Sequence, residues 1–231
     1  MIGQRVAAVR ERIARAAARA GCQAEDVTLV AVSKTHPPAL VREAVEAGLR
    51  DFGENRVQEA ESKGTELSSL RSVGLRWHLV GHLQANKARK AAALFDRIHS
   101  VDGIEIGRKL DRVAAEQGRS LGVLVQVDLA GESTKHGVEE AALFALLEDA
   151  RGWEALRMDG LMILPPWSAD PEGSRPFFRR LRELRDQARA RGLLAGSELS
   201  MGMSHDLEVA VEEGATLVRV GTALFGERIR D

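Results

Sequence analysis

The sequence contains one cysteine, no tyrosine, almost no net charge and no long hydrophobic run. Cys22 alone cannot form an internal disulfide, which favours a reducing compartment and predicts a cytoplasmic protein. The formal net charge of −1 provides no basic field that would attract nucleic acid or an anionic membrane. No segment approaches the roughly 18 apolar residues of a transmembrane helix. We therefore expect a soluble protein whose partners must be inferred from a site.

The N-terminal segment, residues 1–20, is rich in arginine and alanine. Organelle-targeting peptides share that composition, but this segment contains Glu11 and lacks serine, so an amphipathic helix is the better interpretation. A chain of 231 residues can form one large domain, and no shift in composition marks a boundary. We expect residues 1–231 to be a single domain that begins with a helix.

After this helix, short β-rich runs alternate with longer helical patterns, which is typical of βαβ units on a parallel sheet. The predicted strands are residues 28–34, 49–53, 76–81, 97–101, 122–129, 158–164, 198–202 and 216–221. The predicted helices between them include residues 38–47, 86–93, 103–117, 139–149, 175–191 and 204–213. Several helices should end at a glycine in a left-handed conformation: Gly48, Gly118, Gly192 and Gly214.

Eight parallel strands separated by helices predict an α/β fold of the (β/α)8 TIM barrel type. The alternative is a doubly wound open sheet. That fold normally has a glycine-rich turn after its first strand, and residues 33–36 (SKTH) contain no glycine. The barrel is therefore the preferred prediction, and its active site would lie at the carboxyl ends of the strands.

Lys34 ends the apolar run of the first predicted strand. Burial there would favour a neutral amine, which is a nucleophile that can form a Schiff base. The alternatives are a lysine that extends to solvent or one that is salt-bridged. Because side chains alternate along a strand, Lys34 shares a face with Val30 and Val32, and we expect it to point into the barrel mouth.

The ends of the seventh and eighth predicted strands have the composition of an anion site. Barrels commonly hold phosphate in the loops after these two strands. The seventh strand ends around Ser200 and Met201, and the eighth at Gly221 and Thr222, so hydroxyls and small residues would let backbone N–H groups approach phosphate. The alternative is that Ser204 and Thr222 only cap helices.

Arg219 shares a strand face with Leu217 and Gly221 and would project into the barrel beside this anion site. A buried guanidinium needs an acceptor, which could equally be a carboxylate. An imine-forming Lys34, a phosphate site and an inward arginine together describe a site for a phosphorylated aldehyde. A Schiff-base aldolase on a sugar phosphate is less favoured, because no acid/base residue near Lys34 can be identified.

Six segments of the sequence match a known family. They are LVAVSKTHPP (29–38), DFGENRVQE (51–59), WHLVGHLQANK (77–87), STKHGV (133–138), GLMILPP (160–166) and LSMGMSHDLEVAVEEGATLVRVGTALFGER (199–228). In these segments the chain resembles the pyridoxal 5′-phosphate homeostasis proteins (the YggS/PROSC family), which share the barrel of the alanine racemase N-terminal domain. The segments extend over nearly the whole chain, and the first and last are highly specific together.

The resemblance implies that Lys34 carries pyridoxal 5′-phosphate (PLP) covalently as an internal aldimine. It also implies that Ser200, Gly221 and Thr222 hold the phosphate. We count Met201, next to Ser200, among the cofactor-binding residues. PLP is a phosphorylated aldehyde, which is the class of ligand that Lys34, the phosphate site and Arg219 predict.

The resemblance further implies that Arg219 faces the pyridine nitrogen of PLP. Because an arginine does not readily lose its proton, the ring nitrogen would stay unprotonated and PLP would be a poorer electron sink. Asn55, in the GEN motif, would line the other side of PLP; the alternative is a helix N-cap. The chain departs from many relatives at Arg56, His82 and His205, which affects the pocket rim only.

Four polar residues near the end of the third predicted strand could suggest a metal or catalytic cluster: His78, His82, Gln84 and Asn86. Their spacing is not that of a zinc site and no carboxylate ligand is near in sequence, so we predict no metal. Lys87, Arg89 and Lys90 fit a solvated helix face better than a docking patch. Lys135 could be a second amine that accepts PLP, although an ordinary surface lysine is the simpler interpretation.

Two functions compete on this fold, a PLP-dependent amino-acid racemase and a carrier that binds, buffers and delivers PLP. Alanine racemase uses a tyrosine from a second, β-rich domain as one of two bases, whereas this chain has no tyrosine and ends at Asp231. Racemisation needs a base on each face of PLP, and only Lys34 is obvious, although His205 could serve. We predict a monomeric PLP homeostasis protein without substantial catalysis, whose partners would be PLP-dependent apo-enzymes.

Overall fold

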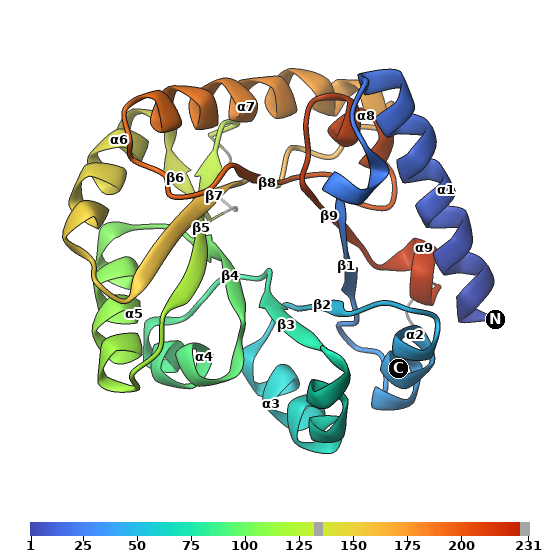
Figure 1. Ribbon diagram of the computed structural model, residues 1–231. Coiled ribbons are helices and arrows are strands. Elements are labelled where there is room, and N and C mark those ends of the chain that lie inside the picture. Colours follow the sequence, from blue (N-terminus) through green and yellow to red (C-terminus); the bar gives the residue numbers. More distant parts are fainter. Residues whose placement is uncertain (132–135, 227–231) are drawn as a thin grey trace.

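The computed structural model describes residues 1–131 and 136–226. In this part of the chain, eight parallel strands form a barrel with the helices on its outside (Figure 1). The barrel strands are β1 (Thr28–Val32), β2 (Asp51–Glu54), β3 (Arg76–Leu79), β4 (Arg97–Val101), β5 (Leu121–Asp128), β7 (Leu156–Met162), β8 (Glu198–Ser200) and β9 (Leu217–Val220). The two-residue strand β6 (Val138–Glu139) pairs with the end of β5.

The barrel is closed by pairing of β4 with β5. The other neighbours follow in the order β4, β3, β2, β1, β9, β8, β7 and β5, and the pairs are parallel. This ring confirms the predicted barrel, because an open doubly wound sheet would have two free edges. The carboxyl ends of the strands consequently meet at one mouth.

The helices are α1 (Ile2–Ala20), α2 (Pro38–Glu46), α3 (Val57–Glu66), α4 (Ala88–Leu94), α5 (Ile104–Glu116), α6 (Glu140–Asp149), α7 (Arg175–Ala190), α8 (Leu207–Glu212) and α9 (Thr222–Phe225). The glycines predicted to end helices have positive φ angles: Gly48, Gly118, Gly192 and Gly214. Among the described helices, none is long and apolar enough to cross a membrane.

The predicted N-terminal helix is present and lies along the outside of the barrel (Figure 1). One face of α1, including Val6 and Val9, is buried against the body of the protein, and α1 packs on α8 and α9. Arg12 Nε and Nη2 also donate to the Glu208 carboxylate on α8 at 2.6 and 2.7 Å. These contacts make α1 a structural part of the barrel.

Two differences from the sequence prediction bear on the region around Lys34. Helix α3 was not predicted, because its sequence VQEAESKGTE has a lysine, Lys63, at one of its three buried positions and so lacks an apolar stripe. Strand β1 ends at Val32, two residues earlier than predicted. The chain turns after this residue. Thr35 has a φ of 65°, which is left-handed and incompatible with the negative φ angles of a β-strand.

The barrel interior is divided into an apolar and a polar part. A small cluster inside the barrel, separate from the main core between strands and helices, is apolar: Val30, Leu124, Met162 and Leu217. The neighbouring strand residues Leu29 and Val218 belong to the main core, which confirms the predicted inward faces of β1 and β9. The polar part of the interior includes the buried side chains of Asp51, His78, His99, Ser200 and Arg219.

Candidate functional site

A cavity of about 470 Å³ opens at the carboxyl ends of the barrel strands. Sites for small molecules typically measure about 300–1,000 Å³. Five of the seven residues predicted to bind a cofactor line this cavity: Lys34, Asn55, Arg219, Gly221 and Thr222. Sequence reasoning had located these residues at the ends of three strands, and closure of the barrel brings them together.

Lys34 lies in a turn that is held by hydrogen bonds. The Ser33 N–H donates to the backbone of β2 and the His36 N–H donates to Ser33 O, each at 3.0 Å. Thr35 has a φ of 65°, which is rare for a threonine, and its N–H donates to the Glu59 carboxylate. A strained conformation persists only where its surroundings over-determine it, so this turn fixes the backbone of Lys34.

A buried ion pair supports the same turn. Lys63 Nζ donates to Ser33 O at 2.6 Å, to Glu54 Oε1 at 2.7 Å and to Glu59 Oε1 at 2.8 Å. Burial raises the pKa of Glu54, although the nearby Lys63 ammonium opposes that rise. The pair joins β1, β2 and α3 around Lys34. Sequence reasoning missed it, although the glutamate at the end of a buried strand was an available signal.

Arg219 lines the cavity although only 4% of it is exposed. Its Nη1 donates to Ser200 Oγ at 2.6 Å and its Nη2 donates to Ile163 O at 2.7 Å. The acceptors are therefore a hydroxyl and a carbonyl, in place of the carboxylate that the sequence left open. Burial lowers the pKa of Arg219 to about 10, which still leaves the guanidinium charged at neutral pH.

Ser200 and Met201, the other two predicted cofactor residues, do not line the cavity. Both are completely buried, and Ser200 Oγ is occupied by Arg219 and by His99 Nδ1 at 2.8 Å. The alternation of side chains predicts the inward direction of Ser200 but not its depth in the barrel. In the structure Ser200 Oγ supports Arg219, and Met201 belongs to the main core. The predicted roles of both residues in cofactor binding stay predictions.

Gly221 and Thr222 lie where β9 passes into α9. A Cβ atom on Gly221 would lie 3.3 Å from Val32 O, so a larger residue would crowd the backbone at the end of β1. Ser204 Oγ accepts the Ala223 N–H at 3.2 Å, although the N-caps of α8 and α9 are Asp206 and Gly221. Asn55 does not cap α3, because the N-cap of that helix is Arg56. The Asn55 side chain is therefore available to the cavity.

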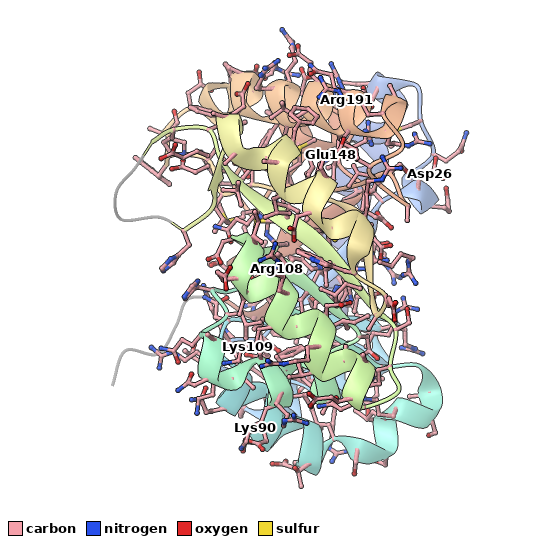
Figure 2. The ribbon with its side chains drawn as sticks, turned by 90° about the vertical axis from the view of Figure 1, so that its left-hand side faces the viewer. Asp26, Lys90, Arg108, Lys109, Glu148 and Arg191 are labelled. Atoms are coloured by element: carbon pink, nitrogen blue, oxygen red, sulfur yellow. The ribbon has the colours of Figure 1, made fainter. Side chains whose placement is uncertain are left out.

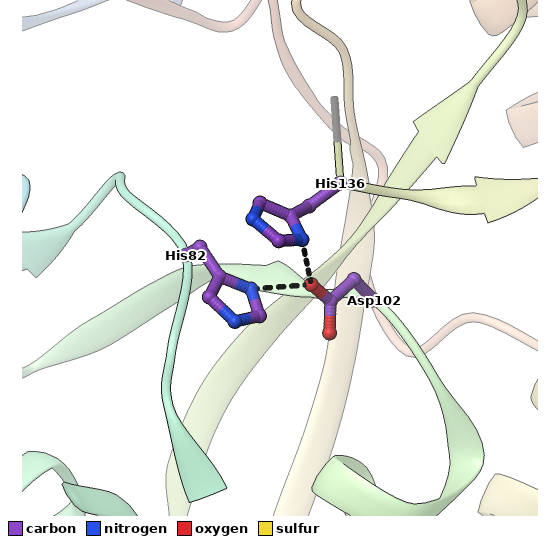
Figure 3. Close-up of side chains that lie close together, drawn as sticks. All are labelled: His82, Asp102 and His136. Atoms are coloured by element: carbon purple, nitrogen blue, oxygen red, sulfur yellow. Dashed lines mark hydrogen bonds and ion pairs between the residues drawn. The ribbon is translucent and has the colours of Figure 1, made fainter. Parts of the chain in front are cut away.

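His82 and His136, which also line the cavity, meet at Asp102 (Figure 3). Asp102 Oδ2 lies 2.7 Å from His82 Nδ1 and 4.0 Å from His136 Nδ1. Sequence reasoning missed Asp102, which follows a different strand from His82. The two imidazole rings are stacked, with centroids 3.7 Å apart and an angle of 11° between planes.

This stacking matters for metal binding. An imidazole nitrogen binds a metal along a lone pair that lies in the ring plane, and the lone pairs of two parallel rings do not converge on one ion. His82, Asp102 and His136 offer the donor types of a metal site, but the two rings would have to turn before they could share an ion. The absence of a metal stays a prediction.

The remaining sequence candidates do not form one cluster. His78 is buried inside the barrel, whereas His82 lies at the mouth. Arg89 and Lys90 are exposed and form ion pairs with Glu116 and Glu61, which is what a solvated helix face predicts. Lys90 points outward from the helix layer (Figure 2). Lys135 lies outside the described residues.

Comparisons with known proteins agree with the fold and with the motifs. The family model "Alanine racemase, N-terminal domain" matches residues 5–229. The chain is 45% identical over 227 residues to the "Pyridoxal phosphate homeostasis protein" of Pseudomonas aeruginosa, covering 98% of this chain and 96% of that protein. It is 43% identical over 225 residues to the protein of the same description from Aquifex aeolicus, covering 97% of each.

Solved structures give the same result. PipY of Synechococcus elongatus, solved without PLP, superimposes with a TM-score of 0.89 at 43% identity, over 98% of this chain and 100% of PipY. PipY with PLP bound superimposes with a TM-score of 0.87 at 42% identity, over the same shares of both chains. An alanine racemase of Clostridium difficile has a TM-score of 0.70 at 17% identity over 89% of this chain and 54% of the racemase, which shows a common fold alone.

Proposed function

The chain belongs to the pyridoxal phosphate homeostasis proteins, which are built on the alanine racemase N-terminal domain, and from this we propose that it binds PLP at the barrel mouth and serves intracellular PLP homeostasis. The observation that carries the proposal is that Lys34 and the buried Arg219 line one cavity with Asn55, Gly221 and Thr222. PLP supplies an aldehyde, a phosphate and a ring nitrogen, and these residues provide a partner for each.

We assign Lys34 to the covalent attachment of PLP through a Schiff base. The fixed turn around Lys34 supports this role, because a tether must hold its amine at one place in the cavity. Gly221 and Thr222 would hold the phosphate. Ser204, whose Oγ accepts the next N–H along the chain, that of Ala223, would help to fix the start of α9. Asn55 would contact PLP from the opposite side of the cavity.

Arg219 would face the pyridine nitrogen. Its pKa of about 10 keeps it charged, so the guanidinium acts as a hydrogen-bond donor and would not give its proton to the ring. PLP stabilises carbanions best when its ring nitrogen is protonated, and a lasting arginine contact reduces that capacity. This chemistry favours holding the cofactor over amino-acid catalysis.

The competing function is an amino-acid racemase, for which one observation speaks. His82, hydrogen-bonded to Asp102 at 2.7 Å, and His205 both line the cavity and could serve as a base besides Lys34. Chiral analysis of alanine and other amino acids after incubation with the loaded protein separates the two functions. Inversion that disappears in Lys34→Ala would establish the racemase.

The proposed carrier role includes delivery of PLP to apo-enzymes by a cytoplasmic monomer, with residues 1–231 as one binding unit. An acceptor would approach across the rim of the cavity at His205, whose ring centroid lies 6.5 Å from that of Trp167. Trp167 and Met203 are two of the exposed large apolar side chains of the described chain. Size-exclusion chromatography with light scattering tests the monomer, and a dimer at micromolar concentration would contradict it.

The central experiment is the absorption spectrum. Wild-type protein mixed with PLP is expected to show the visible band of a lysine imine, and borohydride should bleach it. Lys34→Ala should remove the band completely, whereas Lys87→Ala, at a lysine near the mouth that does not line the cavity, should keep it. A wild-type protein that gains no visible band from PLP would refute the assignment.

A further inference from the structure

A continuous chain of hydrogen bonds crosses the polar part of the barrel interior and ends at Arg219. Asp51 Oδ1 lies 2.9 Å from His78 Nε2, and His78 Nδ1 lies 2.9 Å from His99 Nε2. His99 Nδ1 lies 2.8 Å from Ser200 Oγ, which accepts Arg219 Nη1 at 2.6 Å. Each of these five residues is less than 10% exposed.

The residues at the two ends of this hydrogen-bond relay, Arg219 and Asp51, fix the direction in which its hydrogen bonds are donated. Arg219 can only donate hydrogen bonds, and an ionised Asp51 can only accept them. Burial raises the pKa of Asp51, but hydrogen bonds from His78 and Arg76 outweigh it and hold the pKa well below its usual range. Arg76 forms the outer boundary of the chain, since its Nε and Nη2 each donate to the Asp51 carboxylate at 2.7 Å.

The donors and acceptors between these ends then follow one after another. Ser200 accepts from Arg219 and donates its hydroxyl proton to His99 Nδ1. His99 donates from Nε2 to His78 Nδ1, and His78 donates from Nε2 to Asp51. Complete burial holds the pKa of His99 well below its usual range, so His99 is neutral. Both histidines carry their proton on Nε2 in this pattern.

If the two histidines donated in the opposite direction, toward Ser200, the relay would need one more proton. A doubly protonated His78 would donate from Nδ1 to His99, and His99 would then donate from Nδ1 to Ser200. The two patterns differ in the tautomer of His99, which is an observable quantity.

Polar residues in a barrel interior replace apolar packing, and they are stable only when every one of them has its hydrogen-bond partners. Leu124 and Met162, in the other part of the interior, show the usual apolar filling.

We propose that Asp51, His78, His99 and Ser200 are positioning residues that orient Arg219 toward the ligand in the cavity. A neutral hydroxyl thereby takes the place of a hydrogen-bonded carboxylate, while Asp206 acts on Arg219 through its charge. A carboxylate beside Arg219 would compete with the ligand for its N–H groups. With a neutral hydroxyl and a carbonyl as partners, Arg219 keeps donors for the cavity. The identity of the ligand as PLP rests on the proposed function. The hydrogen-bond relay from Asp51 through His78, His99 and Ser200 to Arg219 does not depend on it.

The relay is tested first without cofactor. Nitrogen-15 NMR of histidine side chains should show His78 and His99 as Nε2–H tautomers at pH 7, with signals assigned from His78→Gln and His99→Gln. His99 protonated on Nδ1 would overturn the proposed direction. Because this measurement is made on folded, cofactor-free wild-type protein, it decides the direction even if the protein does not bind PLP.

The second test measures the effect on Arg219. Ser200→Ala and Asp51→Asn should each raise the Kd for PLP about tenfold, the loss expected of one hydrogen bond to a charged group, and shift the visible band. Leu124→Ala, which opens a cavity in the apolar part of the same interior, is the control and should leave both unchanged. Wild-type values in Ser200→Ala and Asp51→Asn would overturn the role of the relay, whereas a colourless wild type would refute the proposed function instead.

Discussion

At the residue scale, the position of Lys34 depends on the buried pair of Glu54 and Lys63. Neither side chain is more than 6% exposed, and Lys63 bonds both to the Glu54 carboxylate and to the carbonyl of Ser33, the residue before Lys34. Removal of one partner from such a pair leaves a buried charge without compensation. The pair is therefore a better target than Lys34 itself for testing how the turn is held.

We expect Lys63→Met to lower the free energy of unfolding by about 3–5 kcal/mol. The loss should depend on pH. A carboxyl whose pKa is higher in the folded protein than in the unfolded chain gives stability that is complete below the unfolded pKa and lost as pH rises through the folded pKa. Burial raises the pKa of Glu54, and without Lys63 it rises further. The loss should therefore be small near pH 4 and grow toward pH 7, as measured by urea denaturation.

Two variants serve as controls for this experiment. Lys90→Ala breaks an exposed ion pair with Glu61 and should cost less than about 1 kcal/mol at any pH. The double variant Lys63→Met with Glu54→Gln removes the buried charge and should recover part of the loss at pH 7. A loss for Lys63→Met that is equal at pH 4 and pH 7 would contradict the role of Glu54.

Sequence reasoning finds residues whose chemistry is unusual for their position. A lysine at the end of an apolar strand and an arginine on an inward strand face are such residues, and both line the cavity. Ser200 does not line the cavity itself, because alternation gives the direction of a side chain but not its depth in the barrel. Asp102 and Lys63 could not be found, because their roles depend on contacts with other elements that only the folded barrel brings close.

At the element scale, the eight strands were predictable because each is a short β-rich run between helical patterns. Helix α3 could not be predicted in this way, because its buried face includes Lys63, whose charge is paired with Glu54 on β2. The early end of β1 could not be predicted either, because the left-handed conformation of Thr35 is held by the Glu59 carboxylate on α3. Both errors have one cause, which is that contacts between elements override local pattern.

Packing between α5 and the segment before β7 provides a prediction at this scale. A Cβ atom on Gly107 of α5 would lie 2.0 Å from Cη2 of Trp153, and the indole is anchored by its Nε1–H to Asp149 at 3.1 Å. Alanine favours a helix over glycine by about 1 kcal/mol. Gly107→Ala should nevertheless destabilise the protein by about 1–3 kcal/mol, because the ring must move. Chemical denaturation measures this difference.

The matched control is Gly3→Ala in α1. A Cβ atom on Gly3 would have no neighbour within 4 Å, so only the helix preference acts and the variant should be neutral or more stable. Equal effects of the two substitutions would show that Trp153 adapts without cost and that α5 is not held by this contact.

At the scale of the whole molecule, closure of the barrel links the cavity to global stability. The residues assigned to PLP come from the ends of β1, β2 and β9, which are distant in sequence but joined in one ring. A ligand that binds only the folded state stabilises it by mass action, with about 2.7 kcal/mol at a concentration of 100 times Kd. For a domain of this size, 1 kcal/mol shifts Tm by about 2–4 °C.

We therefore expect saturating PLP to raise the Tm of the wild-type protein by about 5–10 °C, and removal of PLP by dialysis against hydroxylamine to reverse the shift. Differential scanning calorimetry measures both changes. Lys34→Ala should keep only the smaller shift that non-covalent contacts with Arg219 and Gly221 provide. An identical shift in Lys34→Ala and the wild type would show that PLP stabilises the barrel without the lysine, and the role of Lys34 as a tether would then be wrong.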